Sequence, residues 1–372
     1  MKVELSIVMP CLNEIETIAI CISKAQQFMQ THNIRGEVII GDNGSTDGSI
    51  EKARSLGAIV VEVKAKGYGN ASRGAIEAAK GKYIITADTD DSHDLLNLEP
   101  FINKLKEGYE LVMGNRFKGK HQKNAMPFLH RYVGNPVLTF IGNLFFRTSI
   151  GDFHCGLRGF TKTAYKKMDL NSQGMEFASE IVVKASMLKL KICEVPTTVF
   201  AAGRTRKPHL RTFPDGWRHL RFLLLYSPKW LFLIPGVLLF FLGIVGLLLL
   251  LNSNSGITYI RESTLILGII LFSFQFIVFY GLTKVFAVNH GLIPKGANYA
   301  TLFKYFNLER GLIFGGVSTL FGSALLYFGF VSDLKIESTL LFIFPAIIAI
   351  ALGVQIILFS FFFSILGLVE KK

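Results

Sequence analysis

Short apolar runs alternate with longer amphipathic stretches over the first 200 or so residues of the chain. The short runs have the length of strands buried in a sheet, and they are Leu5–Met9, Val38–Gly41, Ala58–Glu62, Tyr83–Thr86 and Leu111–Gly114. Helical spacing of apolar residues occurs between them, at Ile15–Gln30, Thr46–Ser55 and Asn70–Ala79. This alternation predicts an α/β fold with a mostly parallel sheet and crossover helices.

Long stretches almost free of charge follow from about residue 228. Four of them reach or approach the roughly 20 residues that span a hydrocarbon core, at about 230–251, 264–286, 311–331 and 339–366. We therefore expect a catalytic α/β domain over 1–200, a basic juxtamembrane or interfacial segment over 201–229, and an all-α four-helix transmembrane domain over 230–372.

The loops between the four predicted spans differ in charge. The second loop carries Lys295, Lys304 and Arg310, whereas the first and third each carry one basic residue beside acidic ones. Because positive residues favour the cytoplasmic side, both termini and the first domain are expected in the cytoplasm. The run Leu5–Met9 is also too short for the apolar region of a signal peptide. We expect a multi-pass integral membrane protein.

The chain is strongly basic, with a formal net charge of +13 over 372 residues. Much of the excess precedes the first predicted span, at Arg204, Arg206, Lys207, Arg211, Arg218 and Arg221. Juxtamembrane basic residues attract anionic headgroups, so we interpret most of this charge as membrane contact. No nucleic-acid partner is predicted, and a homo-oligomer stays open.

Polar clusters follow the first, second and fourth apolar runs, at Pro10–Glu14, Asp42–Asp47 and Asp88–Asp90. In open parallel sheets, ligands bind at the carboxyl ends of the strands, so the three clusters are expected on one rim. Asp88 and Asp90 are two residues apart, and in an extended segment both would point the same way. Hard oxygen ligands of this kind suit Mg²⁺ or Mn²⁺ carrying a diphosphate.

The first domain resembles glycosyltransferase family 2, with its GT-A (Rossmann-like) nucleotide-sugar fold. The matching motifs are V-M-P-C-L-N-E at Val8–Glu14, D-N-G-S-T-D-G at Asp42–Gly48, K-G-Y-G-N-A at Lys66–Ala71, the D-x-D triplet at Asp88–Asp90, G-N-R-F at Gly114–Phe117 and D-F-H-C-G-L-R-G-F at Asp152–Phe160. The last two motifs and the apolar tail are similar to the polyprenyl-phosphate glycosyltransferases, a group that includes dolichyl-phosphate mannose synthase and undecaprenyl-phosphate glucosyltransferases.

The resemblance implies a nucleotide-sugar site beside a metal site. Its nucleotide-sugar residues would be Pro10, Asn13, Glu14, Asp42, Lys66, Gly67, Asp88 and Thr89. Helix capping is the structural alternative for Asn13, and a plain surface turn is the alternative for Lys66 and Gly67. The metal ligands would be Asp88 and Asp90. Ser92 would complete the coordination sphere directly or through water, and having no contact with the metal is an equal alternative.

A lipid phosphate acceptor is already an oxyanion near neutral pH, so it needs cations that position it more than it needs a base. Guanidinium groups form bidentate pairs with phosphate. The candidates for holding the acceptor phosphate are Arg116, Arg131, Arg204 and Arg206. For Arg131, contact with lipid headgroups is an equal alternative. The resemblance places Asp152 near the acceptor phosphate and the sugar, where it would orient the sugar. Arg116 and Asp152 are the candidate catalytic residues.

These features predict an inverting membrane glycosyltransferase that moves one sugar from a nucleotide-sugar to a polyprenyl phosphate. UDP-glucose is the favoured donor and GDP-mannose the second, and the residues leave dolichyl and undecaprenyl acceptors open. A processive polysaccharide synthase is one alternative, although the chain lacks the Q-x-x-R-W motif expected there. A non-catalytic membrane scaffold on the same fold is the other, although it would not need the carboxylates that are present.

Overall fold

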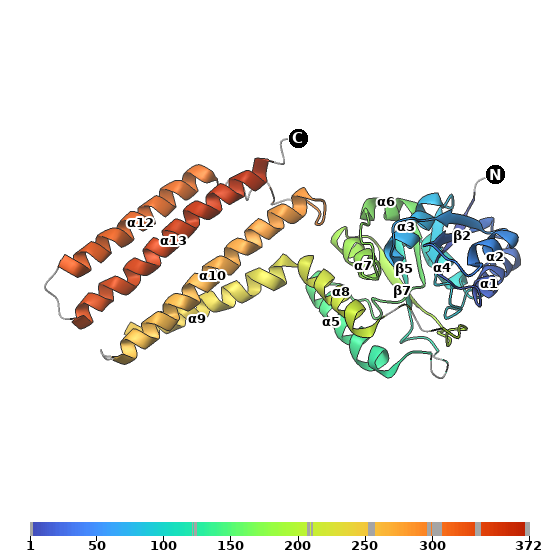
Figure 1. Ribbon diagram of the computed structural model, residues 1–372, viewed down its shortest axis with the longest axis horizontal. Helices are drawn as coiled ribbons and strands as arrows, with labels where there is room; N and C mark the ends of the chain where they lie inside the picture. Colours follow the sequence, from blue (N-terminus) through green and yellow to red (C-terminus); the bar gives the residue numbers. More distant parts are fainter. Residues whose placement is uncertain are drawn as a thin grey trace. The chain divides into compact units, whose positions relative to one another are not determined.

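The computed structural model describes residues 3–120, 122, 125–206, 209, 211–251, 257–295, 299, 307–331 and 336–368. Lys207 and Lys304, named above for their charge, lie outside these ranges. The chain divides into two compact units, Met1–Leu223 and Leu224–Lys372. Each unit is described by itself below, with its elements labelled as in Figure 1.

A seven-stranded sheet forms the centre of the first unit among the described residues, in the order β3-β2-β1-β4-β6-β5-β7. The strands are β1 Leu5–Cys11, β2 Gly36–Asp42, β3 Ile59–Glu62, β4 Tyr83–Thr86, β5 Leu111–Asn115, β6 Arg158–Thr161 and β7 Ile192–Pro196. All five strands predicted from apolar runs are present. The sheet is mixed because β6 runs antiparallel to both β4 and β5.

Helices cover both faces of this sheet (Figure 1). They are α1 Ile18–Thr31, α2 Ser49–Ser55, α3 Tyr68–Ala78, α4 Glu99–Lys106, α5 Asn135–Phe146, α6 Lys162–Met168, α7 Phe177–Met187 and α8 Thr212–Leu225, with a π-helical turn η1 at His130–Gly134. The main core lies between the sheet and α1, α2 and α4. On the other face α3 packs closely, since a Cβ at Gly41 of β2 would lie 2.2 Å from the carbonyl oxygen of Ala71.

The alternating residues of β1 show how the sequence builds this core. Leu5, Ile7 and Met9 point to one face and have no exposed surface, as the two-residue period of a strand requires. The helix predicted from Ile15 begins at Ile18 instead, because Asn13 takes a left-handed backbone conformation with φ at +55°. The chain therefore turns at the sheet rim before the helix starts.

The carboxyl ends of β1, β2, β4 and β5 lie at the same edge of the sheet. β1 pairs in parallel with β2 and β4. β5 runs in the same direction as β4, because β6 lies between them and is antiparallel to both. The predicted clusters after β1, β2 and β4 therefore do share one rim. The segment that begins with Arg116, after β5, joins them there.

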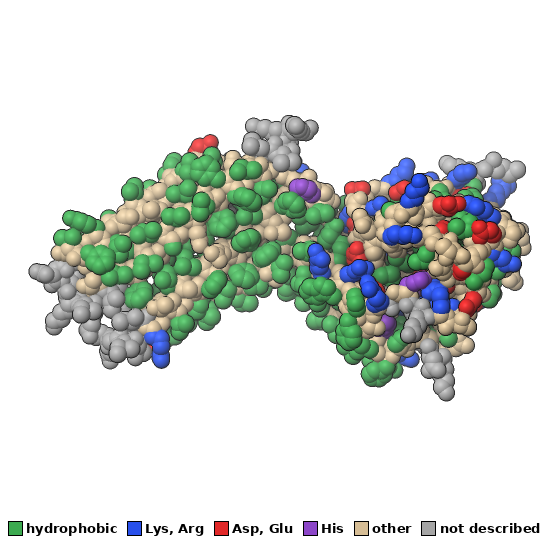
Figure 2. All heavy atoms as spheres, viewed as in Figure 1, with side chains coloured by type: hydrophobic (Ala, Val, Ile, Leu, Met, Phe, Trp, Pro, Cys, Tyr) green, Lys and Arg blue, Asp and Glu red, His purple; other side chains and the backbone are tan. Residues whose placement is uncertain are grey.

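The second unit consists of long apolar helices. In its described part these are α9 Ile234–Leu251, α10 Ile257–Asn289, α12 Leu308–Val331 and α13 Ile336–Leu368, preceded by the π-helical turn η2 at Lys229–Leu233. Four helices in the described residues are long and apolar enough to cross a membrane, at Lys229–Leu250, Arg261–Asn289, Leu308–Val331 and Phe342–Gly367. Their visible surface is mainly hydrophobic (Figure 2). The predicted all-α transmembrane domain is confirmed.

Candidate active site

Asp88 stands just beyond β4 and is held at both of its carboxylate oxygens. The Tyr68 hydroxyl lies 3.1 Å from Oδ1, and His93 Nε2 lies 3.1 Å from Oδ2. Burial raises the pKa of Asp88, but the hydrogen bonds from His93 and Tyr68 and the charges of His93 and Arg116 outweigh it, so the net shift is downward. Asp88 is therefore an oriented carboxylate, ionised at neutral pH.

Asp90 is engaged differently from Asp88. Its Oδ1 accepts the Ser92 hydroxyl at 2.5 Å and the Ser92 backbone N–H at 3.1 Å. Its Oδ2 lies 3.1 Å from Arg204 Nη2, and the Asp90 side chain is 14% exposed. Ser92 thus contacts the D-x-D triplet through Asp90, at the place where the sequence predicted a third ligand.

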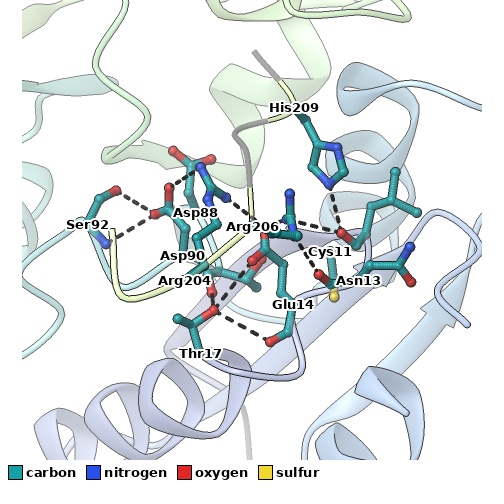
Figure 3. Close-up of polar contacts among 12 residues, drawn as sticks. Cys11, Asn13, Glu14, Thr17, Asp88, Asp90, Ser92, Arg204, Arg206 and His209 are labelled. Atoms are coloured by element: carbon teal, nitrogen blue, oxygen red, sulfur yellow. Dashed lines mark hydrogen bonds and ion pairs between the residues drawn. The ribbon is translucent and has the colours of Figure 1, made fainter. Parts of the chain in front are cut away.

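A basic strap, residues 199–206, lies along the loop that carries these groups (Figure 3). The backbone N–H of Phe200 donates to Ser92 O at 2.9 Å, and that of Gly203 donates to Asp90 O at 3.0 Å. The strap thereby carries Arg204 and Arg206 to the rim, although both are distant from it in sequence.

Glu14 receives both arginines of the basic strap. Arg204 Nη1 lies 2.8 Å from Glu14 Oε1, and Arg206 Nη2 bonds the same oxygen. Arg206 also donates through Nε to Asn13 O at 2.8 Å. Burial raises the pKa of Glu14 although both arginines lower it. Arg204 therefore bridges Glu14 and Asp90, so the predicted nucleotide and metal residues are joined by one cation (Figure 3).

The other predicted nucleotide residues on β1 and β2 form a network of loop contacts. Asn13 Oδ1 accepts the Thr46 N–H at 2.8 Å, so this side chain joins the two loops rather than capping its own helix. Asp42 is buried and accepts the N–H groups of Gly44 and Ser45 at 2.7 and 3.0 Å. These bonds give the loop after β2 a defined shape.

Pro10 and Thr89 meet where β1 ends. The Thr89 hydroxyl donates to Pro10 O at 2.9 Å, and Thr89 O accepts the hydroxyl of Thr17 at 2.7 Å. Thr89 is buried, so its side chain fixes the triplet against β1 while the flanking carboxylates stay at the surface of the site.

Lys66 and Gly67 lie at the start of α3. Lys66 Nζ donates to Asn43 O at 2.6 Å, which brings its ammonium to the loop after β2. Gly67 has φ at +128°, and a Cβ there would lie 2.2 Å from Gln173 O. Only glycine takes this conformation without strain, so the backbone at Gly67 approaches the segment before α7 closely.

Arg116 and Asp152 form a buried pair beyond β5. Arg116 Nε lies 2.7 Å from Asp152 Oδ2 and Nη2 lies 2.9 Å from Oδ1, so the ion pair is bidentate. Asp152 has no exposed surface, whereas the Arg116 side chain is 14% exposed. Burial raises the pKa of Asp152, but the charge and hydrogen bonds of Arg116 lower it further, so the carboxylate stays ionised.

Arg131 is placed in η1 and separate from these pairs. Its guanidinium lies 5.3 Å from the ring centroid of Tyr132. Within the described residues no hydrogen bond joins Arg131 to the groups around Asp90 or Asp152. The preceding His130 has its pKa lowered by burial and by the charge of Arg116.

Two contributors to the site escaped the sequence analysis: Tyr68 as a partner of Asp88, and the buried Arg158. The Arg158 guanidinium donates to the carbonyl oxygens of Phe153 and Cys155 at 3.1 and 2.6 Å. Tyr68 could have been found, because it opens the helix directly after Lys66 and Gly67. Burial raises the pKa of Cys155 to about 12, which agrees with packing rather than nucleophilic chemistry.

The side-chain oxygens of this site fit a hard divalent cation whose coordination sphere is completed by a bound phosphate or by water. Asp90 and Ser92 offer such donors beside the oriented Asp88. Among the described residues no group of three or more His, Cys, Asp and Glu side chains is arranged to hold a metal alone. The rest of a coordination sphere would have to come from phosphate oxygens or water, and Arg204 neutralises Asp90 in this arrangement.

Comparisons with known proteins agree with this architecture. Residues 6–169 match the family model of glycosyl transferase family 2, and residues 281–367 match that of the glycosyltransferase family 2 C-terminal transmembrane region. The low-salt glycan biosynthesis hexosyltransferase Agl6 of Haloferax volcanii is 37% identical over 381 residues, covering 98% of this chain and 89% of that protein.

Two further similarities cover a little more than half of this chain. The dolichyl-phosphate hexose transferase of Haloferax volcanii is 28% identical over 194 residues, which cover 52% of this chain and 81% of that protein. A crystal structure of glucosyl-3-phosphoglycerate synthase from Mycobacterium tuberculosis, in complex with Mn²⁺ and UDP, aligns with a TM-score of 0.47 at 21% identity, over 60% of this chain and 79% of that one.

Proposed function

Because this chain belongs to glycosyltransferase family 2, we propose that it is a membrane hexosyltransferase that moves one sugar from a nucleotide-sugar to a polyprenyl phosphate. The observation that carries the proposal is the arrangement of the rim. The carboxylates of Glu14 and Asp90, after β1 and β4, face the arginines of the basic strap, and the Arg116–Asp152 pair stands beyond β5. The alignment with Agl6 over nearly the whole chain supports hexose transfer.

The donor would occupy the rim between β1, β2 and β4. Glu14 and Asp42 offer carboxylates to the nucleoside, and Lys66 brings an ammonium to the loop after β2. Mg²⁺ or Mn²⁺, held by Asp90 with Asp88 and Ser92 beside it, would neutralise charge on the departing nucleoside diphosphate. UDP-glucose is the first donor to test and GDP-mannose the second.

The acceptor phosphate would be held by guanidinium groups. Arg116 keeps part of its surface exposed while Asp152 fixes its orientation from below. Arg204 and Arg206 would exchange partners when donor and metal bind. A cation at Asp90 would compete with Arg204 for that carboxylate, and the diphosphate would offer both arginines new anionic partners. Each arginine would then exchange a carboxylate for a phosphate and remain in an ion pair. Asp152 then acts through Arg116 and toward the sugar, and no base is needed for a phosphate nucleophile.

The deciding experiment is transfer of radiolabelled sugar by the purified full chain in detergent. UDP-glucose and GDP-mannose are offered separately with undecaprenyl or dolichyl phosphate and with Mg²⁺ or Mn²⁺. We expect a mild-acid-labile glycolipid from one donor, abolished by a chelator. Polymer formation, or no lipid product from either donor, would contradict the proposal.

Asp90→Asn tests the metal residue within the same assay. Its product formation should fall by at least about a hundredfold, the scale of losing one electrostatic stabiliser of a transition state. Asp94→Asn, four residues further along, serves as the matched control and should transfer sugar like the native chain. Native activity of Asp90→Asn would remove the metal from the proposal.

A further inference from the structure

Two histidines and a serine form a buried polar chain between the Asp152 loop and α8. His154 Nε2 lies 3.3 Å from the Ser179 hydroxyl oxygen, and that oxygen lies 2.9 Å from His219 Nδ1. The imidazole rings stand edge to face with their centroids 4.5 Å apart. Ser179 belongs to α7 and has no exposed surface. Three segments that are distant in sequence thus share one polar contact.

Both imidazoles are neutral near neutral pH. Burial lowers the pKa of His219 to about 4, with Arg158 lowering it further and Asp215 opposing. Burial also lowers the pKa of His154 well below its usual value, together with the charges of His219, Arg116 and Arg158. A neutral imidazole has one donor and one acceptor nitrogen. The hydrogen bonds from His154 through Ser179 to His219 must therefore all donate in the same direction.

That direction follows from His154 Nδ1, which is buried and has no hydrogen-bond partner among the described residues. A buried N–H without a partner is more costly than an acceptor without one, so the proton belongs on Nε2. His154 Nε2 then donates to Ser179, and the Ser179 hydroxyl donates to His219 Nδ1. His219 is therefore the terminal acceptor of the chain.

The other end of this chain touches the Asp152–Arg116 pair. The backbone N–H of His154 donates to Asp152 Oδ1 at 3.3 Å, and the same oxygen accepts Arg116 Nη2 at 2.9 Å. Arg158 holds the carbonyl oxygens on both sides of His154. The loop is thus fixed at its backbone by Arg158, and the side chain of His154 links it through Ser179 to α8.

The link leads to a helix with two different faces. Asp215, His219, Phe222 and Leu223 of α8 are buried, whereas Phe213 and Trp217 are 79% and 58% exposed. α8 also contacts η1, because His130 Nε2 lies 3.1 Å from the Thr212 hydroxyl. The buried face of α8 therefore carries His219 to Ser179, while its exposed first residue, Thr212, contacts η1.

We propose that His219 is a positioning residue for sugar transfer: through Ser179 and His154 it sets the orientation of Asp152, and thereby of the Arg116 guanidinium. The inference rests on the proposed function. An apolar side chain would fill the same space more cheaply, since buried polar groups cost free energy unless they are paired. The polar link instead gives α8 a defined geometry relative to the reacting phosphate.

Three variants of the full chain in detergent test this role. His219→Phe keeps an aromatic ring but removes the acceptor nitrogen, His219→Asn restores an acceptor oxygen, and Ser179→Ala breaks the chain in the middle. His32→Phe is the matched control, because His32 is exposed at the end of α1. The measurements are kcat, KM for donor and acceptor, and hydrogen–deuterium exchange of a peptide covering residues 150–157.

His219→Phe and Ser179→Ala should lower kcat about tenfold, the effect of losing one buried hydrogen bond, with the donor KM within about twofold of native. Amide exchange in residues 150–157 should quicken, and His219→Asn should recover most of both losses. Native kcat in His219→Phe would overturn the proposal. So would equal impairment of the Asn and Phe variants, because that points to packing alone.

Amide exchange separates this inference from the proposed function. If the native chain transfers no sugar, the proposed function fails, and the coupling of α8 to the Asp152 loop is still decided by exchange. Unchanged exchange in both His219→Phe and Ser179→Ala would overturn the coupling whatever the enzyme transfers.

Discussion

Arg204 is the residue whose contacts bear most directly on the metal. It bridges Glu14 and Asp90 in a region where its own side chain is 13% exposed. A divalent cation at Asp90 would face this positive charge at short range, where screening by water is weak. A metal ion at Asp90 would therefore compete with the Arg204–Asp90 ion pair.

Arg204→Gln should bind Mn²⁺ more tightly than the native chain, by about fivefold to tenfold, because one charge that opposes the cation is gone. Electron paramagnetic resonance of free Mn²⁺, without any donor, measures this directly. Arg54→Gln is the control, since Arg54 pairs with Glu62 on an exposed surface. Unchanged or weaker Mn²⁺ binding in Arg204→Gln would refute the competition.

Asp152 makes stability depend on pH in a stated direction. Its pKa is lowered in the folded chain by Arg116, against the opposing effect of burial. An unfolded aspartate titrates near about 3.9, so the stabilisation is complete above that pH and is lost as the pH falls through the lower folded value.

Asp152→Asn should therefore lose less stability than the native chain between about pH 5 and pH 3. It should be less stable at neutral pH by about 3 kcal/mol, because Arg116 stays buried without its counter-charge. Thermal unfolding of both proteins across this range measures the difference. Parallel pH curves for the two proteins would show that Asp152 does not contribute this pH dependence.

At the scale of elements, α12 and α13 pack through glycine. A Cβ at Gly315 would lie 2.7 Å from Gly353 O, and one at Gly322 would lie 2.7 Å from Ala346 O. Small residues let membrane helices approach closely, and the gain comes from van der Waals contact between backbones. Gly316 is different, because a Cβ there would meet no atom within 4 Å.

Gly315→Val should separate α12 from α13 and lower the unfolding temperature in detergent, at a cost of about 1–3 kcal/mol for overpacking. Gly316→Val provides the matched control on the neighbouring position and should unfold close to the native temperature. Equal unfolding temperatures for the two variants would contradict the close packing at Gly315.

The sheet shows where the pattern of apolar residues reaches its limit. β4 coincides with its predicted run, and β1, β2, β3 and β5 overlap theirs. In β1, β2, β4 and β5 four or more buried residues follow one another, which is a strong signal, whereas β3 at the sheet edge has none and was found from its apolar residues alone. β6 reads Arg-Gly-Phe-Thr and shows no such run. Its place between β4 and β5 comes from pairing with both neighbours, which no local pattern encodes.

For the whole molecule, the four apolar helices in the described residues identify an integral membrane protein. We expect both termini and the first unit on the cytoplasmic side, because the loop after α10 carries basic residues such as Lys295. An even number of spans requires the two termini to share a side.

Protease protection of terminal tags tests this topology. An N-terminal and a C-terminal epitope should both be cleaved in inside-out vesicles and both be protected in right-side-out vesicles, because protease cannot cross the bilayer. Protection of one tag and cleavage of the other in the same vesicles would imply an odd number of spans.

The sequence by itself determined the α/β class, the four apolar helices and the acidic groups of the rim. Asp88 and Asp90 could be placed because they follow a buried strand, and residues after parallel strands collect at one edge. Such inferences work because burial imposes a period on neighbouring residues, and that period is visible along the chain.

Only the tertiary structure decided which charges meet. Arg204 and Glu14 are 190 residues apart, Arg116 and Asp152 are 36 apart, and Ser179 and His219 are 40 apart. Sequence analysis offered Arg204 and Arg206 to the acceptor phosphate and gave no sign of their contacts within the protein, where both arginines pair with Glu14 and Arg204 also pairs with Asp90. Hydrogen bonds and ion pairs need contact within a few ångströms, and packing of distant segments sets that contact, not their local pattern.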